Sequence, residues 1–238
     1  MTIVASGGGG PPPADTFPRL LLAGDTLLAA RSLIGARLVR AADPSAAGTG
    51  RADAPRIGRI VEVEAYVGPD DRASHARMGR TARNAPMFGP AGIAYVYLVY
   101  GVHHCLNVVT GNDGFPAAVL VRAVEPLEGL DTMRRARDDD RAARASRATV
   151  PDPRLAAGPG MVGAAFGVDR TLNGIDLCDP RSTLHLAPAP AGEPAPEIAA
   201  TPRIGIAFAT TPWTGVPWRF VDASSRSLSR PLRVGAVS

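Results

Sequence analysis

The chain has 238 residues, of which 45% are apolar and 20% are charged, and its formal net charge is +4. This composition is typical of a globular protein with a sizeable core and excludes a largely disordered chain. All 26 basic residues are arginine, so covalent catalysis through a lysine Schiff base is excluded. The basic balance permits a nucleic-acid partner without requiring one.

Targeting signals and cysteine usage indicate the cellular compartment in which the protein is expected. No apolar run approaches the roughly 18 residues of a membrane span, so we expect no membrane contact. The first residues lack a basic segment followed by an apolar one, and we therefore expect a cytoplasmic protein that is not secreted. Cys105 and Cys178 are far apart and lack CxxC spacing, which favours a reducing compartment and argues against a zinc site.

The N-terminal part of the chain divides into a tail and the start of a domain. Residues 1–16 carry runs of Gly and Pro without periodicity and predict a disordered tail, while residues 17–238 are expected to form a single domain. Apolar residues at helical spacing in Phe17–Arg40 predict helices, with Asp25 as an N-cap. Ala41–Pro55 is rich in small residues and Pro and predicts a hairpin insertion.

The strongest strand signal follows at Arg59–Val67. Its alternation places Glu62, Glu64 and Tyr66 on one face, and Gly68-Pro69 ends it. Two carboxylates and a phenol on one face are typical either of a functional site or of an edge strand whose polar face meets water. The strand alone leaves both interpretations open.

A second strand region, Ile93–Val109, carries Gly101 near its middle and predicts a β-hairpin with its turn close to Tyr100–His103. An aromatic residue at such a tip is either a buried anchor or a wedge that enters between stacked bases. Asn107, on the returning strand, either satisfies the backbone or reads a base edge. The preceding segment, Asp70–Ala91, is Arg-rich and irregular, which is typical of functional or disordered loops.

The rest of the chain predicts alternating strands and helices. They are expected at Ala117–Val124 (strand), Leu127–Arg147 (helix), Pro151–Asp169 (short helix entered through Gly158-Pro159-Gly160), Thr183–Ala187 (strand) and Pro202–Ala209 (strand). Arg122 is the one charge in the first of these strands and needs an anionic partner if it is buried, for which Glu62 and Glu64 are the candidates.

Polar-tipped aromatic residues gather in one region of the sequence. All four tyrosines and three of the four histidines lie between residues 66 and 104. Residues of this kind are expected in a pocket that stacks a planar ligand.

The carboxylate pair leaves three possibilities. Glu62 and Glu64 could act as acid and base in glycoside-type hydrolysis, or as metal ligands beside a histidine, or one could be functional and the other paired with an arginine. We favour the third possibility. Since adjacent His103 and His104 cannot readily bind one ion, and nothing else completes a ligand set, we expect no metal.

Taken together, the motifs resemble the alkyladenine (3-methyladenine) DNA glycosylase family over nearly the whole chain, from about Leu20 to Val221. The ordered series carries this resemblance better than any single motif. It comprises Glu62-Val-Glu-Ala-Tyr66, Gly68-Pro-Asp-Asp-Arg-Ala-Ser-His75, Arg83-Asn84, Met87-Phe88, Tyr95-Val-Tyr-Leu-Val-Tyr-Gly101, Cys105-Leu-Asn107, Val121-Arg-Ala-Val-Glu-Pro-Leu-Glu-Gly129 and Gly158-Pro-Gly160.

The resemblance implies an α+β domain around a curved antiparallel sheet with flanking helices and a protruding hairpin. It implies no cofactor, and a partner that is double-stranded DNA containing damaged, alkylated or deaminated purines. Its implied site residues are Glu64 as the general base, Arg122 and the main chain of Ile204 as holders of the attacking water, Tyr66, His75 and Tyr97 around the flipped base, Asn107 at the pocket rim and Tyr100 as the intercalating wedge.

Two features depart from the family pattern. The family commonly has Lys after Gly-Pro-Gly, where this chain has Met161, and the N-terminal tail and the Ala41–Pro55 insertion are not family hallmarks. The absence of lysine predicts a monofunctional hydrolase that leaves an abasic site, and a monomer is the default for a protein that scans duplex DNA.

Two rival functions remain open at this point. One is a non-catalytic nucleic-acid-binding module of the same fold, and the other is a small-molecule nucleoside hydrolase that uses the Glu pair. The module would release no base, and the hydrolase would not need Tyr100.

Overall fold

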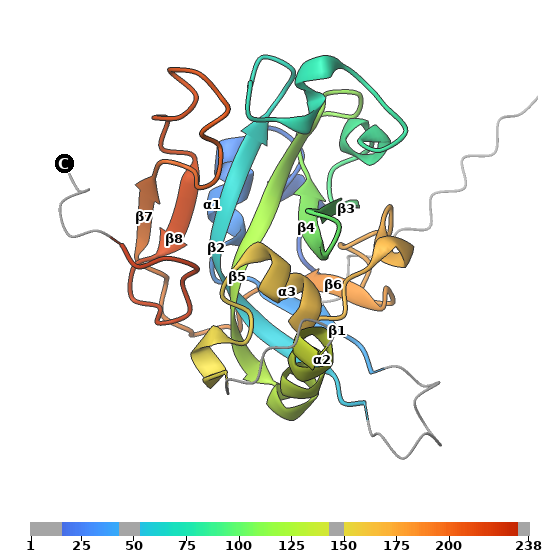
Figure 1. Cartoon of the computed structure of the whole chain (residues 1–238), viewed down its shortest axis with the longest axis vertical. Helices are drawn as coiled ribbons and strands as arrows, with labels where there is room; N and C mark the ends of the chain where they lie inside the picture. Colours follow the sequence, from blue (N-terminus) through green and yellow to red (C-terminus); the bar gives the residue numbers. More distant parts are fainter. Residues whose placement is uncertain (1–15, 43–52, 143–149, 233–238) are drawn as a thin grey trace, which may run out of the picture.

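Two long strands, β2 (Arg56–Val67) and β5 (Ala117–Glu128), pair antiparallel at the centre of the molecule (Figure 1). The computed structural model describes residues 16–42, 53–142 and 150–232, and among these residues β2 and β5 belong to an eight-stranded sheet. The main strand order is β3-β4-β5-β2-β1-β6, and β8 joins β7 to β2. All these ladders are antiparallel, and the expected α+β class is confirmed.

The remaining elements cover or extend this sheet. The strands are β1 (Arg37–Arg40), β3 (Ala94–Val99), β4 (His103–Val109), β6 (Leu184–Ala187), β7 (Ile198–Thr201) and β8 (Arg219–Asp222), and the helices are α1 (Thr26–Leu33), α2 (Leu130–Ala142) and α3 (Pro159–Ala165). In Figure 1, α3 and α2 lie in front of the sheet and α1 lies behind it. Among the described residues no helix is long and apolar enough to cross a membrane.

Strand β2 changes partner along its length, which curves the sheet. Its first residues pair with β1, whereas Glu62–Glu64 pair with β8. The β2–β5 register shifts on both sides of Glu62. Irregularities of this kind bend a strand and redirect its side chains, so they set the direction in which the carboxylates of β2 point.

Both faces of the central strands are buried, which explains their run of apolar residues. Val63 and Ala65 join Leu33 of α1 and Val162 of α3 in the main core, while Val61 packs in a smaller cluster beside β8. A carboxylate on this strand is therefore removed from water and requires partners inside the protein.

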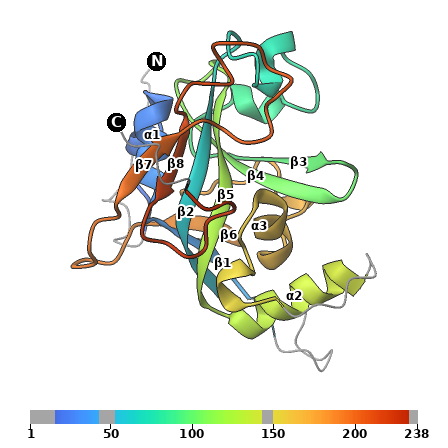
Figure 2. The same cartoon turned by 60° about the vertical axis from the view of Figure 1, so that its left-hand side comes forward.

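Several sequence-based expectations are confirmed. Asp25 caps α1 by accepting hydrogen bonds from the backbone of Leu27 and Leu28 at 2.7 and 2.9 Å. The β3–β4 hairpin turns between Val99 and His103, and Figure 2 shows it projecting from the body. The Asp70–Ala91 segment is irregular apart from two short 3₁₀ turns, His75–Met78 and Ala85–Phe88.

The strand expected at Pro202–Ala209 is wrong. Strand β7 ends at Thr201, and the chain then forms bends and turns in which Gly205 has a φ of +79°, outside the extended region. The alternation of isoleucines in this stretch belongs to a loop, and β8 was not anticipated as a strand.

Other expectations need adjustment or are not covered. The third strand runs on to Glu128, so the following helix begins at Leu130 and not at residue 127. The tail is outside the described residues except for Thr16, as are residues 43–52 of the expected insertion and residues 143–149 of the expected helix.

Candidate active site

A pocket of about 460 Å³ opens where the central strands meet the β3–β4 hairpin and the loop after β7. Seven of the eight residues proposed from the sequence line it: Tyr66, His75, Tyr97, Tyr100, Asn107, Arg122 and Ile204. The eighth, Glu64, is buried at the edge of this lining and bonds to three of its members. The structure thus brings together residues that are up to 140 positions apart.

The Glu64 carboxylate accepts hydrogen bonds from three different parts of the chain. Its Oε2 accepts from the Tyr66 hydroxyl at 2.9 Å and from Nη1 of Arg122 at 3.3 Å, and its Oε1 accepts from the backbone N–H of Ile204 at 2.6 Å. Donors on both oxygens satisfy the buried negative charge and hold the carboxylate at the wall of the pocket.

Arg122 is buried and bridges the two glutamates of β2, as expected from the sequence. Its Nε donates to Glu62 Oε1 at 3.0 Å while its Nη1 donates to Glu64. Burial disfavours its charge, but the charges of Glu64 and Glu62 outweigh that effect and raise the pKa of Arg122. The guanidinium is therefore a permanent cation beside the pocket.

Glu62 has further partners besides Arg122. It accepts from Nε of Arg219 at 2.8 Å and from the N–H and Oγ of Ser229, each at 2.6 Å. Burial acts to raise the pKa of Glu62, yet the bonds and charges of Arg219, Arg122 and Ser229 outweigh burial and lower it. This agrees with the expectation that one carboxylate of the pair is engaged by arginine.

Aromatic rings form another part of the pocket wall. The His75 ring lies edge-on to Tyr97, with centroids 4.4 Å apart, and Tyr95 lies 5.4 Å from Tyr97. His75 Nδ1 and the Tyr95 hydroxyl are 3.0 Å apart. Burial, followed by the charges of Arg83 and Arg77, lowers the pKa of His75 to about 4, so the imidazole is neutral at pH 7.

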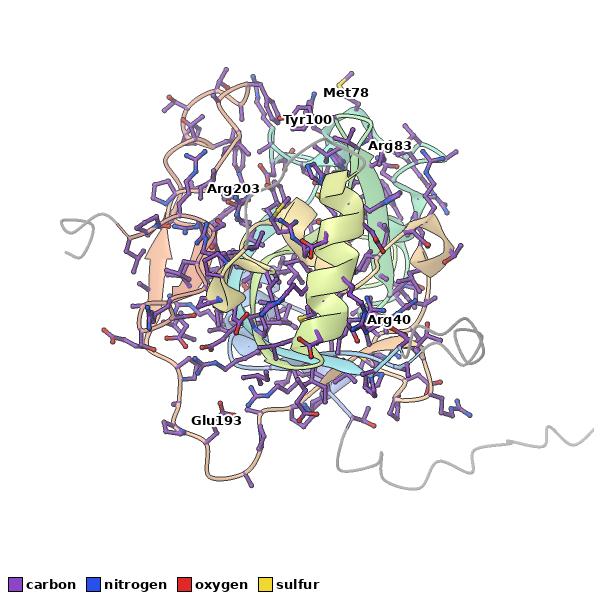
Figure 3. All side chains as sticks on the ribbon, turned by 60° about the horizontal axis from the view of Figure 1, so that its bottom comes forward. Arg40, Met78, Arg83, Tyr100, Glu193 and Arg203 are labelled. Carbon is purple, nitrogen blue, oxygen red and sulfur yellow. The ribbon has the colours of Figure 1, made fainter. Side chains whose placement is uncertain are left out.

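The structure answers one alternative about Asn107 and one about Tyr100. The buried amide of Asn107 donates to the Tyr95 carbonyl at 3.0 Å, so it does satisfy the backbone. The Tyr100 side chain is 92% exposed at the hairpin tip, which excludes the buried anchor. Figure 3 places Tyr100 at the same end of the molecule as Arg83 and Met78, and opposite Glu193.

The sequence did not predict the buried ion pair between Arg203, in the loop after β7, and Asp71. Arg203 donates through Nη1 and Nη2 to the two oxygens of Asp71, at 2.6 and 2.9 Å, and its guanidinium lies over the Tyr66 ring at 4.7 Å. This buried pair holds Arg203 in place, and Arg203 directly precedes Ile204. The backbone N–H of Ile204 is the one that donates to Glu64. The two partners are 132 residues apart, so no local pattern could have revealed them.

Residues 72–112 line part of the pocket, through side chains such as His75, Arg83 and Tyr100, and this segment is its basic mouth. Residues 72–112 contain four arginines and no aspartate or glutamate. Three of these arginines lie over aromatic rings: Arg77 over Phe208, Arg80 over Phe88 and Arg83 over Tyr97. In the described parts of the chain, no three His, Cys, Asp or Glu residues are grouped so that they could hold a metal ion.

The sequence matches known proteins over most of its length. Residues 21–226 match the model of the methylpurine-DNA glycosylase family. A protein of Methanocella arvoryzae is 42% identical over 90% of this chain and 95% of its own length, and one of Myxococcus xanthus is 43% identical over 90% and 93%. Both are named "Putative 3-methyladenine DNA glycosylase". The chain therefore belongs to the methylpurine-DNA glycosylase family.

Proposed function

We propose that this DNA glycosylase excises alkylated or deaminated purines from duplex DNA, with Glu64 as the general base that activates water. The observation that carries the proposal is the position of the Glu64 carboxylate, buried at the wall of an aromatic pocket and held by Tyr66, Arg122 and Ile204. A carboxylate beside the sugar supports both the oxocarbenium-like transition state and the attacking water.

Arg122 and the main chain of Ile204 act on that water as well. Both already contact Glu64, so a water bonded to the carboxylate would lie within reach of the same groups. In this role Arg122 also offsets the negative charge that builds up on the nucleophile as its proton leaves.

The base-binding role falls to Tyr66, His75 and Tyr97. Alkylated purines carry positive charge and stack favourably on electron-rich rings, and the neutral state of His75 avoids a repulsive cation at this wall. Asn107, at the pocket lining, excludes bases with a bulky minor-groove substituent.

Access to the pocket requires a flipped nucleotide, because the target bond is inaccessible inside a stacked duplex. Tyr100, at the exposed hairpin tip, fills the gap that the base leaves. Flipping costs a few kcal/mol, which stacking in the pocket and insertion of Tyr100 offset.

The reaction ends at an abasic site. A lyase step through a lysine imine is excluded because the chain has no lysine. We propose that residues 17–238 act as one glycosylase domain, as a monomer and without a cofactor.

The test is base release from a duplex oligonucleotide that contains hypoxanthine or 3-methyladenine, followed by alkaline cleavage of abasic sites. Wild-type protein is expected to cleave the strand, and Glu64→Gln to lower the single-turnover rate constant at least a hundredfold. Glu197→Gln, an exposed carboxylate outside the pocket, is the matched control and is expected to keep wild-type activity. Excision of bases by Glu64→Gln at the wild-type rate would refute the proposed mechanism.

The same assay separates the rival functions. A non-catalytic binding module would bind duplex DNA in a salt-dependent manner and release no base. A nucleoside hydrolase would cleave free nucleosides and keep its activity in Tyr100→Ala, since a small substrate needs no wedge.

A further inference from the structure

Four buried charges form one cluster below the pocket. Glu62 and Glu64 supply two negative charges, and Arg122 and Arg219 supply two positive charges, so the cluster is neutral as a whole. Each of the four side chains is at most 9% exposed. Arg122 stands between the glutamates, 3.0 Å from Glu62 and 3.3 Å from Glu64, and it therefore divides its charge between them.

The other groups that face this cluster leave its charge unchanged. Arg203 carries a charge near Tyr66, but Asp71 neutralises it through two contacts. Burial raises the pKa of the Cys105 thiol to about 11 and raises the pKa values of Tyr66 and Tyr97, so these three groups are uncharged near pH 7. The electrostatic environment of Glu64 is thus set by the positive charge of Arg122 and by the extent to which Glu62 neutralises that charge.

Glu62 is fixed by a segment that follows the last strand. Ser229 donates both its N–H and its hydroxyl to the Glu62 carboxylate, at 2.6 Å each, across 167 residues of chain. Neighbouring carbonyls bind arginines of the body: Leu228 accepts from Arg154 at 2.6 Å and Arg230 accepts from Arg219 at 3.2 Å. Ser229 lies three residues beyond the end of the family match at residue 226, so the match does not include this latch.

We propose that Glu62, latched by Ser229, is a positioning residue that takes up part of the Arg122 charge and so keeps Glu64 basic enough to accept a proton from water. The proposal rests on the proposed function, because it requires Glu64 to be the general base. It assigns the C-terminal segment around Ser229 a part in the chemistry of a pocket that it does not line.

The physical reason is the sign of the charge left behind. Without the Glu62 charge, the cluster would carry one net positive charge, and Arg122 would face Glu64 alone. A nearby positive charge stabilises a carboxylate in its ionised form and so weakens it as a base. Loss of the Nε contact would leave the guanidinium held only by Glu64 and by a 3.5 Å contact of its Nη2 with the Ser229 hydroxyl, so Nη1 would be aimed at Glu64 less firmly.

The experiment is the pH dependence of single-turnover excision of 3-methyladenine from duplex DNA by the full chain, between pH 5 and pH 8. This leaving base is already cationic, so the acid limb reports the general base. For Glu62→Gln we expect the acid limb to move to lower pH by about one unit and the plateau rate constant to fall roughly tenfold. Glu62→Asp retains the charge and is expected to keep the wild-type position of the limb.

Ser229→Ala tests the latch without changing any charge. It is expected to lower the plateau rate constant roughly threefold to tenfold while the acid limb stays in place. Ser224→Ala is the matched control, because the Ser224 hydroxyl binds Asp222 and not Glu62, and it is expected to behave as wild type.

The outcomes test the positioning role of Glu62 separately from the general-base role of Glu64. A folded Glu62→Gln protein with an unmoved limb and a wild-type plateau overturns the proposal, even when Glu64→Gln is inactive and the proposed function holds. If Glu62→Gln does not fold, a wild-type rate in Ser229→Ala overturns it instead. Full activity of Glu64→Gln would refute the proposed mechanism itself, which is a distinguishable result.

Discussion

At the level of single residues, the candidate general base, Glu64, accepts hydrogen bonds from donors on different elements of the fold. Tyr66 lies two positions along the same strand, Arg122 comes from the paired strand β5, and the Ile204 N–H comes from the loop after β7. Because the three donors belong to different elements, the carboxylate can adopt this position only when the whole sheet and its loop are folded. The Arg203–Asp71 pair extends this dependence to the Gly68–Ala73 turn.

His75 makes the stability of the protein depend on pH. Its pKa is lowered from 6.5 to about 4 by burial and by Arg83 and Arg77, so between these values the unfolded chain binds a proton that the folded chain does not. The stability that a neutral His75 contributes is fully present above about pH 6.5 and is lost as the pH falls towards 4. We expect the free energy of unfolding to fall by about 1–2 kcal/mol over this range, because solvent around the partly exposed ring weakens the effect.

The measurement compares thermal unfolding of wild type and His75→Gln at pH 8 and pH 5. The wild type is expected to lose more stability than the variant between these two values. Parallel pH dependence in the two proteins would show that His75 titrates alike in the folded and unfolded chains.

At the level of elements, strands with a clear period were predictable and the loop after β7 was not. The alternation of Glu62, Glu64 and Tyr66 predicted β2, and Gly101 predicted the hairpin turn. Ile204 and Ile206 alternate as well, yet Arg203 next to them binds Asp71 and Gly205 has a positive φ, so that stretch leaves the sheet.

The site itself was predictable only in part. The gathering of tyrosines and histidines in one sequence region pointed to the pocket, and the lone charge of Arg122 pointed to the glutamates. Contacts such as Ser229 with Glu62 connect residues 167 positions apart, and a single sequence carries no periodic signal for them. Long-range polar pairs therefore required the structure.

The hairpin carries a prediction of its own, because Tyr100 has a φ of +51° at the tip. An L-residue in this conformation costs about 1–2 kcal/mol, whereas Gly adopts it freely but loses more entropy on folding. Tyr100→Gly is therefore expected to change the free energy of unfolding by less than about 1 kcal/mol, while excision from duplex DNA falls at least about tenfold.

Single-stranded DNA with the same lesion is the control for Tyr100→Gly, since it has no stack for a wedge to fill. Excision rates of variant and wild type are expected to converge on that substrate. Equal losses on single-stranded and duplex DNA would argue against the wedge and for a contact with the base itself.

At the level of the whole molecule, charge is distributed unevenly around the pocket. The four arginines of residues 72–112, without an acidic residue among them, equal the net charge of +4 for the entire chain. In Figure 3, Arg83 of this segment lies at the end of the molecule that carries Tyr100. A basic mouth beside an exposed aromatic tip is the charge distribution expected of a protein that binds the phosphates of DNA.

Salt dependence of binding tests whether this basic mouth meets the DNA backbone. Each arginine that neutralises a phosphate adds about 0.9 to the slope of log Kobs against log salt concentration. Arg80 is exposed and lies over the Phe88 ring, so Arg80→Ala removes a charge with little effect on the core. For binding of this variant to undamaged duplex DNA, we expect the slope to be shallower by about 0.9. Arg181 is 89% exposed, is bound to Asp179 before β6, and belongs neither to residues 72–112 nor to the pocket lining. Arg181→Ala therefore removes the same charge outside the mouth and is expected to retain the wild-type slope. Identical slopes for the two variants would mean that DNA responds to the overall charge and not to the mouth.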